Sequence, residues 1–577
     1  MAPILLADLD RCRPNARLRR TLDPGCWRVL PYRADSIPDG RMLGAGETSE
    51  AGAVAYPLER EGWFRISIGI FNGFWRPYRE QRLEVRLAGD RTWSTLVLPP
   101  PSDLPWGIPL DDDRLGPRIT EVAWRTVELH GQALELRQPR AMPLSDQTAA
   151  AVGSAVYVAY LRLDALSAAE VDAVRGDRAR TDTKRLFAYD DTWNPFFEHP
   201  RPMTAEEGAE AIRTQMEPYR GTDFERIYWE GAHGDVCHYP TRVGRTWDAF
   251  ASGSWPRAGD RNVVETWKLW RAAGFDPLAE AIDAAHDAGL EIHATYRLGW
   301  GAFYWPPPFD AYNAGGLFDS HPEWRCVRRD GSADTALSFA FPGVRAFAVR
   351  LLAELATYPV DGLALLFNRQ PPFVGYEAPV LESFRAETGG DALTLPHGDE
   401  AWLLHRARSL TAFLEELRAA VPALPVTAWV FGTREENLDY GLDVPAWVQR
   451  GLVDTVVPYS SQPKGFSWGQ AWSDPDAIAA WLDTVRDTPV RLAPNVMPRD
   501  MSDDEHRQQA LRLYGAGAHA LSFWDTSGRR SLWSGTLARL GHEDELRQWW
   551  SGDTLPRAWQ SRRIFEVAGW RFEHLPE

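Results

Sequence analysis

The sequence predicts a (β/α)8 TIM barrel preceded by an all-β sandwich of jelly-roll type. From about residue 184, short apolar runs alternate with helical patterns, and eight such pairs fill about 365 residues, the period of a (β/α)8 barrel with long loops. Before that point, short runs rich in Val, Ile and aromatic residues lie between Gly, Pro and Asp clusters, and no long stretch has helical periodicity. The chain is therefore expected to divide into a sandwich (1–166), a linker (167–183), a barrel (184–550) and a strand extension (551–577).

The predicted sandwich strands occupy residues 62–71, 81–89, 94–100, 118–129, 133–139 and 155–163. Residues 167–182 are typical of a short helix and a polar linker. The last segment, 561–577, indicates one or two further strands that pack back on the sandwich or the barrel.

The barrel elements follow in order, beginning with a strand at 184–191 and a helix at 204–216, which Thr204 caps with Glu207 three residues later. The next helix ends at Gly289, a typical C-terminal stop. The remaining strands are expected at 225–231, 291–299, 360–369, 425–431, 453–460, 490–497 and 519–525. The remaining helices are expected at 276–289, 343–358, 400–421, 443–451, 474–485, 503–517 and 541–550.

Strand runs such as 363–367 are continuously apolar, as parallel strands buried on both faces must be. A doubly wound open sheet is the main alternative. No Gly-rich phosphate turn follows the first strand, which disfavours that fold and nucleotide binding with it.

Composition narrows the function classes. The chain is 44% hydrophobic and 25% charged, and its net charge of -17 disfavours a nucleic-acid partner, because phosphate binding needs clustered Lys and Arg. The N-terminus lacks a basic start followed by an apolar core, and no apolar run is long enough to span a bilayer, so a cytoplasmic protein without a membrane partner is the default expectation. The four cysteines are scattered without metal-ligand spacing, so no metal or other cofactor is expected.

Aromatic residues are abundant: 27 Trp, 17 Tyr and 24 Phe, many beside Gly, Pro or a charged residue. Sugar rings stack on aromatic side chains, so this favours a carbohydrate ligand, while filling of a large core and of domain seams is the alternative. In the sandwich, the choice between a sugar site and a seam against the barrel concerns Trp63, Phe71, Phe74, Trp75, Trp93 and Trp106.

Polar and aromatic residues gather where the predicted barrel strands end, which is where the reaction takes place in this fold. The strand ends and the loops just after them supply Asp190, Asp191, Trp229, Glu230, His233, Asp235, Tyr239, Tyr296, Arg297, Asn368, Arg369, Glu377, Trp429, Tyr459, Asn495, Trp524 and Asp525. Because Asp190 and Asp191 are adjacent, only one of them can point into the barrel mouth. Two carboxyl groups surrounded by stacking and hydrogen-bonding groups are what glycoside hydrolysis requires.

The stretches 321–331 and 339–369 resemble the glycosyl-hydrolase-like TIM-barrel family related to glycoside hydrolase family 10. They contain a His-Pro-Glu-Trp loop, a Pro-x-Val-Arg helix start and an Asp-Gly before the fourth strand. The resemblance is close over the third and fourth βα units, and over the rest of the barrel it rests only on the repeat of strand and helix. It implies a TIM barrel and a carbohydrate substrate. That family commonly has an acidic residue at the end of strand four, where this chain has Asn368 and Arg369.

The leading hypothesis is hydrolysis of a glycosidic bond, with Glu377 replacing the missing carboxylate as acid/base and a partner among Asp235, Glu230 and Asp525. Substrate binding is assigned to Asp191, Tyr296, Arg297, Asn368, Arg369, Trp429, Tyr459, Asn495 and Trp524.

Each carboxylate has a structural alternative. Glu377 could cap the following helix, Asp525 could cap the loop before the last helix, and Glu230 and Asp235 could orient each other or pair with Arg242. At the level of function, the alternative is an inactive carbohydrate-binding protein on a hydrolase-like scaffold. A metal-dependent hydrolase or lyase ranks lower, because clustered His and Asp ligands are missing from the strand ends.

Overall fold

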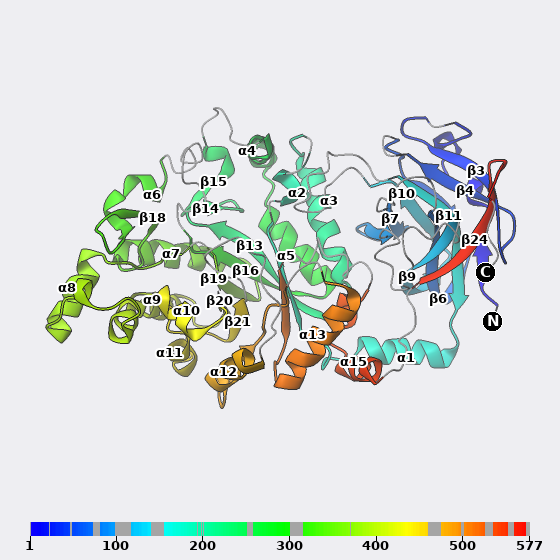
Figure 1. Ribbon diagram of the computed structural model, residues 1–577. Helices are drawn as coiled ribbons and strands as arrows, with labels where there is room; N and C mark the ends of the chain where they lie inside the picture. The colour runs from blue at the N-terminus through cyan, green and yellow to red at the C-terminus, as the bar shows by residue number, and fades with distance from the viewer. Residues whose placement is uncertain are drawn as a thin grey trace.

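The computed structural model describes most of the 577 residues, in these ranges: 2–21, 23–46, 49–72, 81–98, 117–139, 155–192, 194–197, 199, 201–250, 258–299, 315–369, 371–459, 475–497, 501–524, 535–551 and 559–572. Over these ranges the protein is mixed α/β, which confirms the expected class at that level. An antiparallel β part and a parallel β/α part lie side by side (Figure 1).

The β part contains two sheets. One has the order β2-β3-β4-β11-β6-β9-β24-β25, with β1 paired to β11, and the other has the order β5-β10-β7-β8. Apolar side chains of both sheets, among them Ile66, Ile68, Val85 and Leu134, form one buried cluster. The strands are β1 (Ile4–Leu6), β2 (Leu18–Arg19), β3 (Trp27–Ala34), β4 (Gly40–Ala45), β5 (Val54–Pro57), β6 (Glu61–Asn72), β7 (Gln81–Leu87), β8 (Ser94–Leu98), β9 (Arg118–His130), β10 (Ala133–Arg137), β11 (Val156–Ala165), β24 (Trp559–Val567) and β25 (Trp570–Arg571).

The end of the chain returns to its beginning. Strand β24 pairs antiparallel with β9 and with β3, so the C-terminal segment completes the large sheet of the β part (Figure 1). Helix α1 (Ala168–Arg178) connects this part to the first parallel strand and begins with a capping box formed by Ser167 and Glu170.

Parallel strands in the described ranges form a closed ring of pairings. The order β12-β13-β16-β19-β20-β21-β22 is continuous, a single bridge joins Asn495 to Ser522, and β23 pairs with β12. The ring strands are β12 (Leu186–Asp190), β13 (Phe224–His233), β16 (Glu291–Arg297), β19 (Gly362–Leu366), β20 (Val426–Phe431), β21 (Thr455–Tyr459), β22 (Arg491–Leu492) and β23 (Leu521–Trp524). Each overlaps one of the eight strand ranges expected from the sequence.

Helices surround the ring (Figure 1). The expected Thr204–Glu207 capping box opens α3, and Gly289 ends α5 with a positive φ of 81°, which glycine adopts without strain. The helices are α2 (Asn194–Phe197), α3 (Ala205–Met216), α4 (Ala258–Ala273), α5 (Pro277–Ala288), α6 (Leu317–Ser320), α7 (Pro342–Leu355), α8 (Ala378–Thr388), α9 (Glu400–Ala420), α10 (Arg434–Asp439), α11 (Val444–Gln449), α12 (Pro475–Val485), α13 (Asp503–Ala516) and α15 (Glu543–Trp550). Short strands in the loops are β14 (Val236–Cys237), β15 (Arg245–Thr246), β17 (Arg325–Val327) and β18 (Ala333–Leu337).

Alternation along the ring strands separates two cores, because successive side chains of a strand point to opposite faces. On β12, Leu186 and Ala188 pack in the large cluster shared with the helices, whereas Phe187 and Tyr189 pack in a smaller cluster. That smaller cluster contains residues from six of the ring strands, all except β16 and β22, and lies inside the ring, with Trp429, Tyr459 and Trp524 among its members. The ring interior is therefore a packed core, closed by aromatic residues near the carboxyl ends of the strands.

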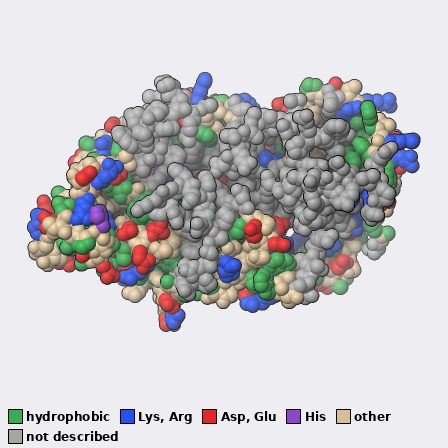
Figure 2. Space-filling view, viewed as in Figure 1, with side chains coloured by type: hydrophobic (Ala, Val, Ile, Leu, Met, Phe, Trp, Pro, Cys, Tyr) green, Lys and Arg blue, Asp and Glu red, His purple; other side chains and the backbone are tan. Residues whose placement is uncertain are grey.

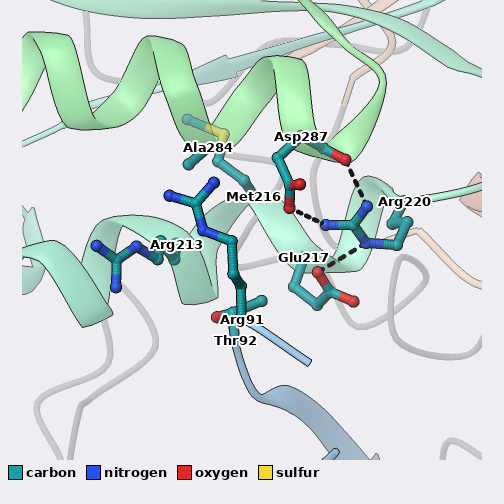
Figure 3. Close-up of a pocket in the computed structure, with 8 residues that line it drawn as sticks. All are labelled: Arg91, Thr92, Arg213, Met216, Glu217, Arg220, Ala284 and Asp287. Carbon is teal, nitrogen blue, oxygen red and sulfur yellow. Dashed lines mark hydrogen bonds and ion pairs between the residues drawn. The ribbon is translucent and has the colours of Figure 1, made fainter. Parts of the chain in front are cut away.

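The two parts meet through charged side chains. Arg91 pairs with Asp283 of α5, and Arg137 lies 2.5 Å from Glu210 of α3. Figure 3 shows a small pocket at this junction. There Arg91 and Thr92 face residues of α5, of α3 and of the 3-10 turn (Glu217–Tyr219) that follows α3. Trp93 lies between the guanidinium groups of Arg86 and Arg137, with centroid distances of 4.3 and 4.4 Å. The other sandwich aromatics differ: Phe71 is buried, Trp63 lies under Arg175 and Arg178 of α1, and Phe74, Trp75 and Trp106 are outside the described residues.

Figure 2 shows acidic and basic side chains interspersed over the coloured part of one face. No helix within the described ranges is both long and apolar enough to cross a bilayer.

Candidate active site

The candidate site lies at the carboxyl ends of the ring strands. Glu230 is on β13, Arg297 on β16, Asn368 just beyond β19, and Trp429, Tyr459 and Trp524 on β20, β21 and β23. Each is on the interior face of its strand by alternation, and each is buried. The ring thus brings together most of the polar and aromatic residues that the sequence analysis placed at strand ends.

Glu230 is the centre of a buried hydrogen-bonded group. Its Oε2 accepts a 2.7 Å bond from the phenol of Tyr189 and lies 2.6 Å from Nη2 of Arg297. The same Nη2 lies 2.6 Å from Oδ1 of Asp191 and donates to the Tyr189 oxygen at 2.9 Å. One guanidinium nitrogen therefore holds two carboxylates beside each other, that of Glu230 on β13 and that of Asp191 just after the neighbouring strand β12.

Burial raises the pKa of Glu230 to about 7, against the opposing effect of the Arg297 cation, and the nearby Asp191 charge adds to the rise. Only 1% of the residue is exposed. Its second oxygen, Oε1, has no hydrogen-bond partner among the described residues. A carboxyl group of this kind holds a proton near neutral pH on an oxygen that is free to donate it.

An aromatic cluster lies against this group. Tyr189 stacks on Trp524 with ring centroids 3.8 Å apart and an interplanar angle of 26°, and Trp429 and Tyr459 meet Trp524 edge-on at 5.5 and 5.4 Å. Arg369 places its guanidinium 4.5 Å from the Trp524 centroid and 5.9 Å from that of Tyr459. Aromatic faces next to carboxylates are suited to a ring with apolar faces and polar edges.

Several polar atoms at this end of the ring are buried without a partner among the described residues. Besides Glu230 Oε1 they are both amide atoms of Asn368, the indole Nε1 of Trp429 and Nε of Arg369. Each such group costs roughly 1–3 kcal/mol unless water or a ligand satisfies it. These four residues come from three strands, β13, β19 and β20, and meet at one end of the ring, which is the arrangement of a site that binds a polar molecule.

Glu377 has hydrogen-bond partners outside the group around Glu230. It occupies the N-cap position of α8, but its carboxylate accepts from the backbone N–H groups of Val327 at 3.0 Å and Gly375 at 2.9 Å. It is fully buried, and burial raises its pKa against those backbone bonds. The structure therefore gives Glu377 contacts that anchor β17 to the loop after β19, and it makes no hydrogen bond or ion pair with Glu230.

Asp235 also has partners outside the group around Glu230. Its oxygens pair with Arg245 at 2.9 and 3.0 Å, rather than with Arg242, and accept from the backbone N–H of Leu317. Tyr296 packs in the outer core shared with the helices, whereas its neighbour Arg297 points inward. Asn495 is buried in the ring and donates to Ser522 at 3.4 Å. Asp525 lies outside the described residues.

Three residues of the site were not assigned from the sequence. Tyr189 orients Glu230, while Thr192 donates to the Glu230 carbonyl oxygen at 3.1 Å and contacts Nδ1 of His238 at 2.9 Å. Burial lowers the pKa of His238 to about 4, so this imidazole is neutral at physiological pH. The sequence does contain one indication of the role of Tyr189. It lies two residues before Asp191 and therefore on the same face of the strand.

No group of three or more His, Cys, Asp or Glu side chains suited to a metal ion occurs within the part of the chain that the structure describes.

Comparison with known proteins gives a family match over part of the chain. Residues 255–507 match the family described as Glycosyl hydrolase-like 10, which confirms the resemblance carried by residues 321–369. The curated protein "Glycosyl hydrolase DigH" of Escherichia coli K12 is 24% identical over 257 residues, which cover 39% of this chain and 55% of that protein. The chain thus spans about half the length of the curated relatives it matches.

Solved structures similar to this one include the catalytic domain of β-amylase from Paenibacillus polymyxa, with a TM-score of 0.40, 12% identity, and coverage of 63% of this chain and 100% of that one. The β-galactosidase of the psychrophilic Marinomonas ef1 has a TM-score of 0.39 at 12% identity and covers 65% of this chain and 62% of its own. The α-galactosidase TtGalA of Thermus thermophilus has a TM-score of 0.33 at 14% identity and covers 90% of this chain and 95% of its own.

Proposed function

We propose that this chain is a glycoside hydrolase, on the premise that residues 255–507 match the glycosyl hydrolase-like family. We interpret the closed ring of parallel strands as a (β/α)8 barrel at 184–550, supported by a β sandwich at 1–166 that the segment 551–577 completes. The observation that carries the function is the buried Glu230 carboxyl, with one oxygen bonded and the other free, beside a second carboxylate and an aromatic cluster.

Glu230 is the proposed general acid/base. With Oε2 fixed by Tyr189 and Arg297, the proton resides on Oε1 and passes to the glycosidic oxygen as the bond breaks. Asp191 is the second carboxylate: it supplies the negative charge that the oxocarbenium-like transition state needs, as nucleophile or as base for a water. Arg297 holds both carboxylates in place and keeps Asp191 paired until substrate binds.

Substrate binding falls to the residues around this pair. The Trp524 and Tyr459 rings offer surfaces for the sugar, and the Asn368 amide and Trp429 Nε1 offer hydrogen bonds to hydroxyl groups. Glu377 and Asp235, whose oxygens are engaged by backbone N–H groups and by Arg245, take structural roles in this proposal.

A second candidate function is carbohydrate binding without cleavage. One observation favours it: Asn368, an amide, lies just beyond β19, and the carboxylates of Glu230 and Asp191 share a single arginine. A site neutralised in this way would hold a sugar and leave its linkage intact.

Measuring binding and reducing-end release on one glycan panel separates the two functions. The full chain is titrated calorimetrically with neutral and acidic oligosaccharides, and the same samples are assayed for new reducing ends. Release that disappears in Glu230→Gln supports hydrolysis. Binding with no release for any bound glycan supports the scaffold, and absence of both contradicts the carbohydrate assignment.

A further inference from the structure

Arg369 lies at the mouth of the ring and has no anionic partner in the part of the chain that the structure describes. Its guanidinium lies over the Trp524 and Tyr459 rings, and among the described residues it forms no ion pair. Its Nε atom is buried and has no hydrogen-bond acceptor within those residues. The aromatic rings hold the group in position, but a cation–π contact leaves its charge uncompensated.

Three other arginines of this part of the fold have acceptors among the described residues. Arg297 contacts the carboxylates of Glu230 and Asp191. Arg245 forms two bonds with Asp235. Arg406, which is also buried, donates to the backbone oxygens of Val374 and Asp439. Within the described ranges, Arg369 differs from these three in having no acceptor, and like Arg406 it has no ion pair; it lies where the proposed substrate would bind.

We propose that Arg369 recognises a carboxylate on the sugar, so that the substrate class of this site is an acidic glycan of uronic-acid type. This inference rests on the proposed function and names its substrate. A guanidinium presents a planar fork of donors that matches a carboxylate bidentately, and such charge-assisted bonds are stronger than bonds to neutral hydroxyl groups.

The surroundings of Arg369 fit the same ligand. Asn368, the preceding residue, has both amide atoms free among the described residues and can bond a hydroxyl beside the carboxylate. Protonated Glu230 adds no repelling charge below about pH 7, because burial raises the pKa of that carboxyl to about 7. An acidic sugar would therefore meet a cation just beyond β19 that has no ion pair among the described residues, and a proton donor on β13.

The test uses the full chain and three matched ligands: short oligouronides, their methyl esters, and neutral oligosaccharides of the same linkage. Affinities are measured by calorimetry at low and at high salt. The wild type is expected to bind the free acid about tenfold or more tightly than the ester. The preference should shrink as salt is added, because Arg369 is partly exposed and dissolved ions screen its attraction for the carboxylate.

Arg369→Gln should lower the affinity for the free acid to that for the ester, so that the preference disappears, and Arg369→Lys should retain part of the preference. Arg350→Gln is the matched control: it removes one positive charge from an exposed arginine of α7 that lies over Phe347, and the preference should remain. Equal binding of acid and ester by the wild type would overturn the proposal. So would an equal loss of both ligands in a folded Arg369→Gln protein, or a stronger preference for a sulfated glycan.

The two levels of inference fail differently. If neutral oligosaccharides bind or are cleaved with no preference for the acid, the carboxylate proposal fails and the glycan function stands. If none of the three ligands binds or is cleaved, both fail.

Discussion

The phenol of Tyr189 donates a 2.7 Å hydrogen bond to Oε2 of Glu230. Tyr189 is itself fixed by stacking on Trp524, so the orientation of the carboxyl is set by packing inside the ring. The bond leaves Oε1 as the oxygen without a partner among the described residues. A carboxyl fixed on one oxygen and free on the other is prepared to transfer a proton in one direction.

We predict that Glu230→Gln lowers kcat by about 10²–10⁴-fold, because the amide cannot donate or accept the proton. The substitution keeps the size of the side chain, so the folded state should persist by circular dichroism. Turnover is measured on whichever glycan of the panel releases reducing ends.

Glu377→Gln is the matched control, since Glu377 is also buried and also has a raised pKa. The new amide would oppose a backbone N–H with its own N–H, so the protein should lose roughly 1–3 kcal/mol of stability and keep its turnover. If Glu377→Gln abolished turnover in a folded protein while Glu230→Gln did not, the acid/base role would belong to Glu377.

The pH dependence of kcat/KM should report Glu230. The pKa of this carboxyl is raised to about 7, so the acid form predominates below that pH and is lost as the pH rises through it. Activity that needs the acid form should therefore fall on the alkaline side of about pH 7. Arg297 opposes the rise in pKa, and Arg297→Gln should move this limb to higher pH by about one unit or more.

Tyr189→Phe should shift the limb in the same direction by a smaller amount, because the phenol's hydrogen bond also lowers the Glu230 pKa. Profiles of both variants are recorded as kcat/KM against pH. An alkaline limb that neither substitution moves would show that another group donates the proton.

The repeating part of the fold was predictable because its strands are buried on both faces. Runs such as 363–367 have no polar position that would suit a half-exposed strand, and capping pairs such as Thr204 and Glu207 mark the helix starts. Strands β3, β4 and β5 were not anticipated. Their segments carry Arg, Pro and Gly residues, and their identity as strands depends on pairing with partners distant in sequence, such as β24.

The part of the site that lies on the ring strands was predictable, because alternation along a strand decides which side chains point inward. Glu230 and Arg297 lie at interior positions near strand ends, whereas Tyr296 must point outward once Arg297 points inward. The environment of Glu377 was not predictable, because it depends on the backbone N–H groups of Val327 and Gly375, which a loop brings to it. Whether it acts in catalysis stays a prediction that the Glu377→Gln control addresses.

Asn368→Leu should stabilise the folded protein and weaken glycan binding. Both amide atoms of Asn368 are buried without partners among the described residues, and leucine has a similar shape without the desolvation cost. The free energy of unfolding should rise by up to about 1–3 kcal/mol, measured by urea denaturation without ligand. A loss of stability would mean that water already satisfies the amide and that no ligand is needed.

His542, near the amino end of β13, should make the free energy of unfolding depend on pH. Its Nδ1 lies 2.7 Å from Asp223, which directly precedes β13, and its Nε2 lies 2.9 Å from Asp177 of α1. Burial alone would lower the pKa of His542, but the bonds to the two aspartates outweigh it and raise the pKa above its usual value.

A raised pKa means that the folded state holds the proton more tightly than the unfolded chain. The stabilisation is therefore complete below about pH 6.5, the ordinary value for histidine, and is lost as the pH rises through the folded-state pKa. His542→Gln should lose about 1.5–3 kcal/mol at low pH and show a flatter dependence on pH, measured by urea denaturation from pH 5.5 to 8.5. Because His542 contacts the residue before β13 and not the strand's carboxyl end, glycan binding should stay unchanged in this variant. An undiminished pH dependence in His542→Gln would assign the effect to another group.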